Sequence, residues 1–237
     1  MRGTIRRVVI RTTPHTPWQA AFLVALPHGL AAGVHLPPTP DPVPEGVLAR
    51  LHPEERAVAV SLGGFRQTQF VGGRLAIAAI AADLGMRRTP TLPNEHGAPV
   101  IGPNTSVSIS HKQDIAVALV ARGCAGLGID IEETDRNRPG VAKRVLTAEE
   151  FAAVEALPES RRWTDTIIRF SVKEAIYKAL HPYLHRYIGF GEVEVWPTPD
   201  GNDVIKPLLE EGPDFVFEAR HFWVEHRVLA TVRVRPA

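Results

Sequence analysis

Two carboxylates separated by one residue stand in an otherwise apolar stretch, Gly128-Ile129-Asp130-Ile131-Glu132. If this stretch is a β-strand, side-chain alternation places Asp130 and Glu132 on one face and the two isoleucines on the other. Like charges side by side on a half-buried strand repel each other and resist desolvation. A hard divalent cation removes both problems, so Asp130 and Glu132 are candidate metal ligands.

A second charged segment follows, Phe170-Ser171-Val172-Lys173-Glu174-Ala175-Ile176-Tyr177-Lys178. It has the character of a helix, in which Glu174 and Lys178 lie one turn apart on one face. Glu174 would supply a third carboxylate to the cation, and Lys178 would stand next to it, where phosphates are expected. The alternative from the residues alone is a surface salt bridge between Glu174 and Lys178, worth a few tenths of a kcal/mol.

Three further motifs precede these segments in the chain. They are Phe70-Val71-Gly72-Gly73-Arg74-Leu75-Ala76, Asn94-Glu95-His96-Gly97-Ala98-Pro99 and Ser108-Ile109-Ser110-His111. Taken in order, all five segments resemble the signature of the 4′-phosphopantetheinyl transferases of the surfactin and enterobactin type. The resemblance extends from about residue 65 to residue 179.

The resemblance implies an enzyme that moves the 4′-phosphopantetheine group of coenzyme A to a serine of an apo carrier protein and releases adenosine 3′,5′-bisphosphate. It implies a Mg²⁺ ion and coenzyme A as co-substrate. Its implied site residues are the metal ligands Asp130, Glu132 and Glu174, the catalytic residues Glu174, Lys178 and His111, and the coenzyme A contacts Arg74, Ser110, His111, Lys173 and Lys178. Glu174 is the candidate base, directly or through a metal-bound water.

One position departs from the family pattern. Some relatives have a basic residue in the short Gly-x-Pro segment, where this chain has Ala98. The contacts to the nucleotide therefore have alternative candidates in Arg87 and Arg88.

Basic residues gather after the carboxylate strand, at Arg136, Arg138, Lys143 and Arg144. By resemblance the partner is an acyl or peptidyl carrier protein, which presents an acidic helix beside the modified serine. A solvated basic face is the alternative interpretation of this cluster. Two other functions stay open: a metal-dependent phosphodiesterase or nuclease, and a catalytically inactive relative that binds carrier proteins.

The composition is that of a globular protein. The 237 residues are 44% hydrophobic and 22% charged, with a net charge of +1, which gives no long-range attraction to nucleic acid. The apolar run at residues 20–26 is too short to cross a membrane. A single cysteine, Cys124, favours a reducing compartment, and we expect a cytoplasmic enzyme. The chain length is similar to that of the larger family members, which are monomers.

The elements that must position these residues predict an α+β fold. We expect helices at 65–84 and 160–180, with Pro182 ending the second, a short helix at 139–145, and a capping box at Thr147. We expect strands at 18–26, 106–110, 115–121, 127–132, 193–196, 215–219, 223–225 and 229–234. We divide the chain into an N-terminal subdomain, 1–122, with coenzyme A contacts and a C-terminal subdomain, 123–237, with metal and catalytic residues. The resemblance implies that the two are similar, related by a pseudo-twofold, with the active site in the cleft between them.

Overall fold

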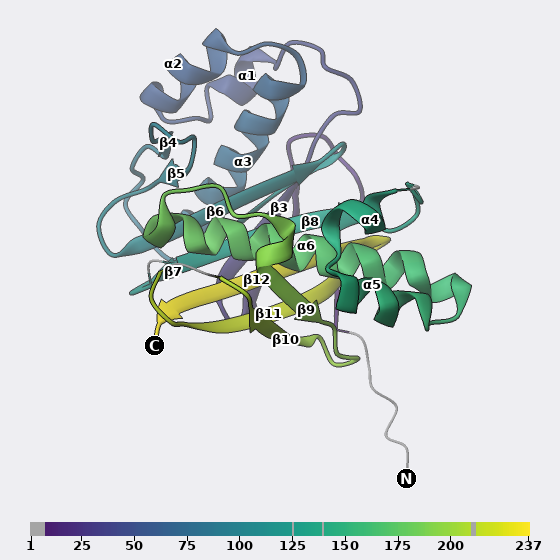
Figure 1. Cartoon of the computed structure of the whole chain (residues 1–237). Helices are drawn as coiled ribbons and strands as arrows, with labels where there is room; N and C mark the ends of the chain where they lie inside the picture. The colour runs from purple at the N-terminus through teal and green to yellow at the C-terminus, as the bar shows by residue number, and fades with distance from the viewer. Residues whose placement is uncertain (1–7, 125, 139, 210–211) are drawn as a thin grey trace. The chain divides into compact units, whose positions relative to one another are not determined.

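The computed structural model of the chain describes residues 8–124, 126–138, 140–209 and 212–237. The chain forms two compact units (Figure 1). We call Thr12–Cys124 the N-terminal unit, and residues 8–11 with 126–237 the C-terminal unit. This division differs from the predicted one at the start of the chain, because β1 (Val9–Ile10) pairs in parallel with β11 (Phe215–Val224) of the C-terminal unit.

The N-terminal unit is an antiparallel sheet covered by one long helix. The strand order is β2-β3-β7-β6, and the helix α3 packs on β3 and β7 over a single apolar core. The elements are β2 (Ala20–Leu26), β3 (Gly29–His35), α1 (Glu45–Leu48), α2 (Pro53–Ser61), α3 (Gly64–Asp83), β4 (Leu92–Pro93), β5 (Pro99–Val100), β6 (Thr105–Lys112) and β7 (Ile115–Arg122).

The strand β3 was not predicted from the sequence. Its residues are mostly glycine and alanine, which carry little strand propensity. The structure shows why small residues stand there, since a Cβ on Gly33 would lie 2.8 Å from Cδ1 of Phe22 on the neighbouring strand. Tertiary packing, and not local preference, therefore determines this strand.

Helix α3 approaches its sheet through two helix glycines. A side chain on Gly72 would overlap Leu36 and lie 2.9 Å from Cβ of Ala116, and one on Gly73 would lie 2.9 Å from Cγ2 of Ile109. The pair Gly72-Gly73 therefore lets the helix backbone lie against side chains of the sheet. Arg74 follows this pair directly.

The C-terminal unit is likewise a sheet of mainly antiparallel strands covered by one long helix, and its sheet is larger. The order is β8-β12-β11-β10-β9, with β1 on β11, and the helix α6 packs on β8 and β12 over a second core. The elements are β1, β8 (Gly126–Glu133), α4 (Val141–Val145), α5 (Ala148–Glu155), α6 (Glu159–Leu184), the 3₁₀ turn η1 (Phe190–Glu192), β9 (Val193–Trp196), β10 (Asn202–Pro207), β11 and β12 (Arg227–Pro236).

Strand β8 approaches α6 through strand glycines. A side chain on Gly128 would overlap the carbonyl oxygen of Ala175, and one on Gly126 would lie 2.8 Å from the carbonyl oxygen of Ala179. The backbones of strand and helix are therefore in direct contact. Side chains farther along the same face of β8 then reach the helix side chains on either side of Ala175.

Both units join antiparallel strands to separate helices, so the predicted α+β class is confirmed. The helix end at Leu180 was wrong, because α6 continues through Pro182 to Leu184. A proline in the last turn removes one hydrogen bond only, and the helix ends two residues later with His185 in a left-handed conformation. The predicted strands 215–219 and 223–225 are one strand, β11, and the start of the predicted helix at Pro139 lies outside the described residues. Within the described ranges, no helix is long and apolar enough to cross a membrane.

Candidate active site

Asp130 lies at the contact between β8 and α6. Its side chain is buried, with 4% of the residue exposed. Ser171 Oγ donates to Asp130 Oδ2 over 3.0 Å, and Lys178 Nζ donates to Asp130 Oδ1 over 2.8 Å. Lys178 Nζ also donates to the carbonyl oxygen of Ile129 over 2.9 Å. Residues 171 and 178 are one turn before and one turn after Ala175, so the close approach at Gly128 brings both to the carboxylate.

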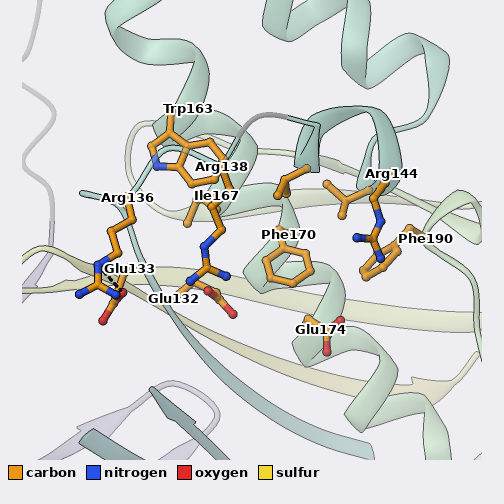
Figure 2. Close-up of a pocket in the computed structure, with 12 residues that line it drawn as sticks. Glu132, Glu133, Arg136, Arg138, Arg144, Trp163, Ile167, Phe170, Glu174 and Phe190 are labelled. Atoms are coloured by element: carbon orange, nitrogen blue, oxygen red, sulfur yellow. Dashed lines mark ion pairs between the residues drawn. The ribbon is translucent and has the colours of Figure 1, made fainter. Parts of the chain in front are cut away.

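Glu132 and Glu174 line one pocket of the C-terminal unit (Figure 2). The pocket has a volume of about 270 Å³. Glu132 is two residues after Asp130 on β8, and Glu174 is on α6 between Ser171 and Lys178. The structure therefore brings the second and third predicted carboxylates to the same cavity.

The pocket has an apolar side and a charged side. Its wall on α6 is the stripe Trp163, Ile167 and Phe170, at helical spacing, and Phe190 of η1 adds a third aromatic side chain, packed against Phe170. Arginines complete the lining together with the carboxylates, and the residues are Glu132, Glu133, Arg136, Arg138, Val141, Arg144, Val145, Trp163, Ile167, Phe170, Glu174 and Phe190. In Figure 2 the side chain of Arg138 reaches toward Glu132. Such a cavity suits a ligand that has both apolar and anionic parts.

Sequence reasoning missed part of this lining. The spacing of Trp163, Ile167 and Phe170 on a predicted helix was a usable signal for a common face. Nothing in the sequence placed Phe190 with them. Trp163 also carries a buried indole Nε1 with no hydrogen-bond partner among the described residues.

The three predicted metal ligands suit Mg²⁺ in donor chemistry, because carboxylate oxygens are the ligands that hard cations prefer. Glu132 and Glu174 share the pocket, whereas Asp130 is bonded to Lys178 and Ser171. Across the described residues, no group of three or more His, Cys, Asp or Glu side chains is gathered so as to hold a metal ion. The metal assignment therefore rests on donor type and on the two glutamates in the pocket.

Lys173 does not lie where we predicted it. We expected a coenzyme A contact, but the side chain is fully buried. Its ammonium donates to Glu150 Oε2 over 2.6 Å, to the Phe190 carbonyl over 2.7 Å and to the Val145 carbonyl over 2.9 Å. These bonds use all three of its donors, so none is left for a phosphate. Burial lowers the pKa of Lys173, while the hydrogen bond and charge of Glu150 act to raise it.

The remaining predicted residues lie in the N-terminal unit. Ser110 is buried and His111 is exposed, and they are successive residues of β6 near its end. Arg74 on α3 is 6% exposed, its Nε donates to the Thr91 carbonyl over 2.9 Å, and its guanidinium lies 4.0 Å from the centre of the Phe70 ring. Burial lowers the pKa of Arg74 to about 10, against the opposing charge of Glu55.

The basic residues predicted to meet the partner divide into two groups. Arg136, Arg138 and Arg144 line the pocket, and Arg136 lies 3.8 Å from Glu133. Lys143 is exposed on the short helix α4 and is not part of the lining. Three of the four residues therefore surround the cavity that holds Glu132 and Glu174.

A cavity that combines carboxylates, arginines and aromatic rings, with a buried aspartate paired to a partly exposed lysine on the same strand and helix, has the features of an enzyme active site. Comparison with known proteins identifies its class. Residues 126–232 match the model of the 4′-phosphopantetheinyl transferase superfamily, and residues 54–121 match the 4′-phosphopantetheinyl transferase N-terminal domain.

Individual relatives agree with this match. The chain is 31% identical to the 4′-phosphopantetheinyl transferase Svp of Streptomyces mobaraensis over 72% of this chain and 70% of that protein. It is 36% identical to a holo-[acyl-carrier-protein] synthase of Limosilactobacillus fermentum over 38% of this chain and 80% of that protein. The holo-[acyl-carrier-protein] synthase structure from Thermotoga maritima aligns with 48% of this chain and 64% of its own, at 25% identity and a TM-score of 0.40. The chain therefore belongs to the 4′-phosphopantetheinyl transferase superfamily, and it is an enzyme of that type.

Proposed function

We propose that this protein transfers the 4′-phosphopantetheine group of coenzyme A to a serine of an apo acyl or peptidyl carrier protein and releases adenosine 3′,5′-bisphosphate. The observation that carries the proposal is the pocket of the C-terminal unit, where Glu132 and Glu174 line one cavity with arginines. The Asp130–Lys178 pair lies on the same strand and helix. Transfer of a phosphoryl group requires mainly positioning and charge, and this combination supplies both.

The proposed reaction is an in-line displacement at the β-phosphorus of coenzyme A. The serine oxygen of the carrier bonds to this phosphorus, and the bond from the phosphorus to the oxygen that bridges the two phosphates breaks. Glu174, directly or through a water, takes the serine proton. Lys178 and His111 stabilise the negative charge that develops on the phosphate oxygens.

We assign Mg²⁺ to Asp130, Glu132 and Glu174. The support is the hard oxygen donors and the shared pocket of the two glutamates. When bound, the ion neutralises and orients a pyrophosphate. In this assignment Asp130 would contribute a carboxylate oxygen to the ion, and the ammonium of Lys178, which donates to Asp130, would lie beside the phosphates.

We assign the coenzyme A contacts outside the pocket to Arg74, Ser110 and His111 of the N-terminal unit. This assignment requires that the two units contribute to one site, in a cleft between similar halves related by a pseudo-twofold. Its support is the match of residues 54–121, which include all three residues, to the 4′-phosphopantetheinyl transferase N-terminal domain.

We further propose that the enzyme acts as a monomer in the cytoplasm on an acidic carrier. Arg136, Arg138, Lys143 and Arg144 would meet the acidic helix of the carrier beside the pocket. An opposite-charge rim of this kind mainly accelerates encounter. The single cysteine is consistent with a reducing compartment.

Mass spectrometry of an apo carrier protein after incubation with the enzyme, coenzyme A and Mg²⁺ tests the proposal. We expect the carrier to gain the mass of one phosphopantetheine group, and E174Q to slow the gain about 100-fold or more. Cleavage of coenzyme A that leaves the carrier unchanged would indicate a phosphodiesterase. A carrier that binds but is not modified would indicate an inactive relative.

A further inference from the structure

A buried ion pair in the C-terminal unit is hydrogen-bonded to residues that line the pocket. The Lys173 ammonium and the Glu150 carboxylate lie 2.6 Å apart, and both side chains are fully buried. Taking two charges out of water is costly, so a buried pair needs further hydrogen bonds to be favourable. The contacts of the two groups show which segments they hold.

The ammonium of Lys173 joins two walls of the pocket. It donates to the carbonyl of Val145, the last residue of α4, and to the carbonyl of Phe190, the first residue of η1. Val145 and Phe190 both line the pocket. Two segments that are distant in the sequence are therefore fixed to one atom of α6, on the residue that precedes Glu174.

The carboxylate of Glu150 connects the same atom to the rest of the unit. Its Oε2 accepts from the Thr147 backbone N over 2.8 Å, which closes the capping box of α5. Its Oε1 accepts from the Val195 backbone N on β9 over 2.7 Å. The pair therefore connects α4, α5, η1 and β9 to α6 through main-chain groups that need donors or acceptors.

We propose that Lys173, held by Glu150, is a positioning residue that sets the place of α4 relative to α6 for carrier binding. This inference rests on the proposed function. Helix α4 carries Lys143 and Arg144, which we assign to the carrier, and its Val145 is tied to Lys173. Loss of the ammonium leaves the carbonyls of Val145 and Phe190 without a buried donor, so both segments shift away from their places.

Arg169 provides a matched control on the same helix. It lies one turn before Lys173, with a side chain 5% exposed, and its Nη1 is 3.7 Å from Glu150 Oε1. Its donors go to Asp165 and to the Val195 carbonyl, and neither residue lines the pocket. R169M therefore removes a buried cation from the same carboxylate without releasing a pocket wall.

The test compares K173M/E150Q with R169M and the wild-type chain. K173M alone leaves the charge of Glu150 without its main partner, which is strongly destabilising. The added E150Q removes that charge and keeps a side-chain oxygen as acceptor. We expect the double variant to fold, to show a KM for the carrier raised about tenfold, and to keep its KM for coenzyme A within about twofold. R169M should keep both constants within about twofold of wild type.

A purely structural role would lower the melting temperature of both variants and leave the two KM values unchanged. That result, or an equal rise in carrier KM for R169M, would overturn the proposal. If the double variant does not fold, E150Q alone serves in the same comparison, with a smaller rise expected in the same constant.

Hydrogen exchange separates this inference from the proposed function. K173M/E150Q should lose amide protection at 141–146 and 189–192, whereas R169M should lose it in β9. Wild-type enzyme that modifies no carrier would refute the proposed function, while the exchange pattern would still test whether Lys173 and Glu150 position α4. Unchanged protection at α4 in the double variant would refute this positioning role even if wild-type transfer is normal.

Discussion

The two units of the molecule use one connection order and differ in how their helix meets the sheet. In the N-terminal unit β3 pairs with β7, β7 pairs with β6, and α3 lies between β3 and β6 in the chain. In the C-terminal unit β8 pairs with β12, β12 pairs with β11, and α6 lies between β8 and β11. Figure 1 shows the long helix on its own sheet in each case.

The difference lies in which element, the helix or the strand, has glycines where the helix packs on the sheet. In the N-terminal unit the helix has the glycines, Gly72 and Gly73, and the sheet keeps its side chains. In the C-terminal unit the strand has them, at Gly126 and Gly128. A strand without side chains at the contact allows its next inward residue, Asp130, to reach the helix. The position of the small residues therefore determines which element carries the buried charge.

Each unit also contains a buried glutamate with the same two tasks. Glu55 accepts from the His52 N, which begins α2, and from the Thr91 N after α3. Glu150 accepts from Thr147 N and Val195 N in the corresponding places. Only Glu150 has a fully buried ammonium against it, since the ion pair of Glu55 is with Arg88 at 3.9 Å. The C-terminal unit is therefore the more tightly fixed of the two around its glutamate.

The largest effect is expected from a substitution that breaks the contact between strand β8 and helix α6. G128A places a methyl group on the backbone carbonyl of Ala175, which cannot rotate away, so β8 must separate from α6. We expect the free energy of unfolding to fall by about 3 kcal/mol or more, the upper range for overpacking. Urea denaturation measures it. Transfer should be lost as well, because Asp130 moves away from Ser171 and Lys178.

The helix contact provides the comparison for that prediction. G72A meets the end of the Leu36 side chain, which can shift, and lies 2.9 Å from Cβ of Ala116, where strand and helix must adjust slightly. Alanine is the better helix former by about 1 kcal/mol and offsets part of this overpacking, so the loss should be about 1–2 kcal/mol. G191A meets nothing within 4 Å and is the control in the C-terminal unit, expected within about 0.5 kcal/mol of wild type. A cost for G72A equal to that of G128A would contradict the distinction between the two contacts.

The next prediction compares a residue of α6, expected to act in catalysis, with a residue of α3, expected to bind coenzyme A. E174Q keeps the shape of the pocket but removes a charge and a base, so kcat should fall about 100-fold or more with little change in stability. R74M on α3 should mainly raise the KM for coenzyme A, because a binding contact serves ground and transition state alike. Steady-state kinetics with both substrates distinguish them. A kcat loss for R74M as large as that for E174Q would contradict the proposal that Arg74 binds coenzyme A while Glu174 acts in the chemical step.

A smaller effect concerns the basic residues on α4. K143E/R144E should raise the KM for the carrier about tenfold at low salt and flatten its salt dependence, since an opposite-charge rim is screened by ions. The KM for coenzyme A should hardly change. R161E/R235E reverses two exposed arginines away from the pocket lining and is the charge-matched control. Movement of the coenzyme A constant alone would place this cluster at the nucleotide.

Part of the candidate site could be predicted from the sequence. Asp130 and Glu132 were chosen because like charges on one face of a strand need an explanation, and Glu174 was added through the family resemblance; Glu132 and Glu174 do share a pocket. The capping box at Thr147 was also readable and is present. Local pattern could not show that its glutamate extends a second oxygen to β9, because that contact depends on chain folding over long distances.

The error on Lys173 has the same physical origin. The sequence pattern around a lysine next to Glu174 on a helix is the same whether that lysine faces a ligand or the core. The Lys173 side chain points into the core because backbone carbonyls of α4 and η1 accept its hydrogen bonds there. These acceptors are distant in the sequence, so no local pattern could predict them. Strand β3 was missed for a related reason, since its small residues are required by Phe22 of the neighbouring strand.

The smallest effect tests the turn that carries Phe190. Arg186 donates twice to Glu192, over 3.0 Å and 2.6 Å, and Gly189 N donates to the same carboxylate over 2.7 Å. The hydrogen bonds from Arg186 lower the pKa of Glu192, with help from Gly189 and against the effect of burial. A lowered pKa in the folded state means that this stabilisation is present above the unfolded-state pKa, about 4.3, and is lost as the pH falls through the folded-state value.

R186M should therefore lower the free energy of unfolding at pH 6 by at most about 1 kcal/mol, because both side chains are partly exposed to solvent. At pH 3 the difference from wild type should shrink, since the protonated carboxyl no longer gains from the arginine. R162M removes the arginine of another partly exposed pair, Arg162–Glu155, and controls for the loss of an arginine at the surface. Urea denaturation at both pH values measures the two differences. A gap between R186M and wild type that stays constant from pH 6 to pH 3 would mean that the arginine acts by packing, and that the turn under the pocket does not depend on the charge of Glu192.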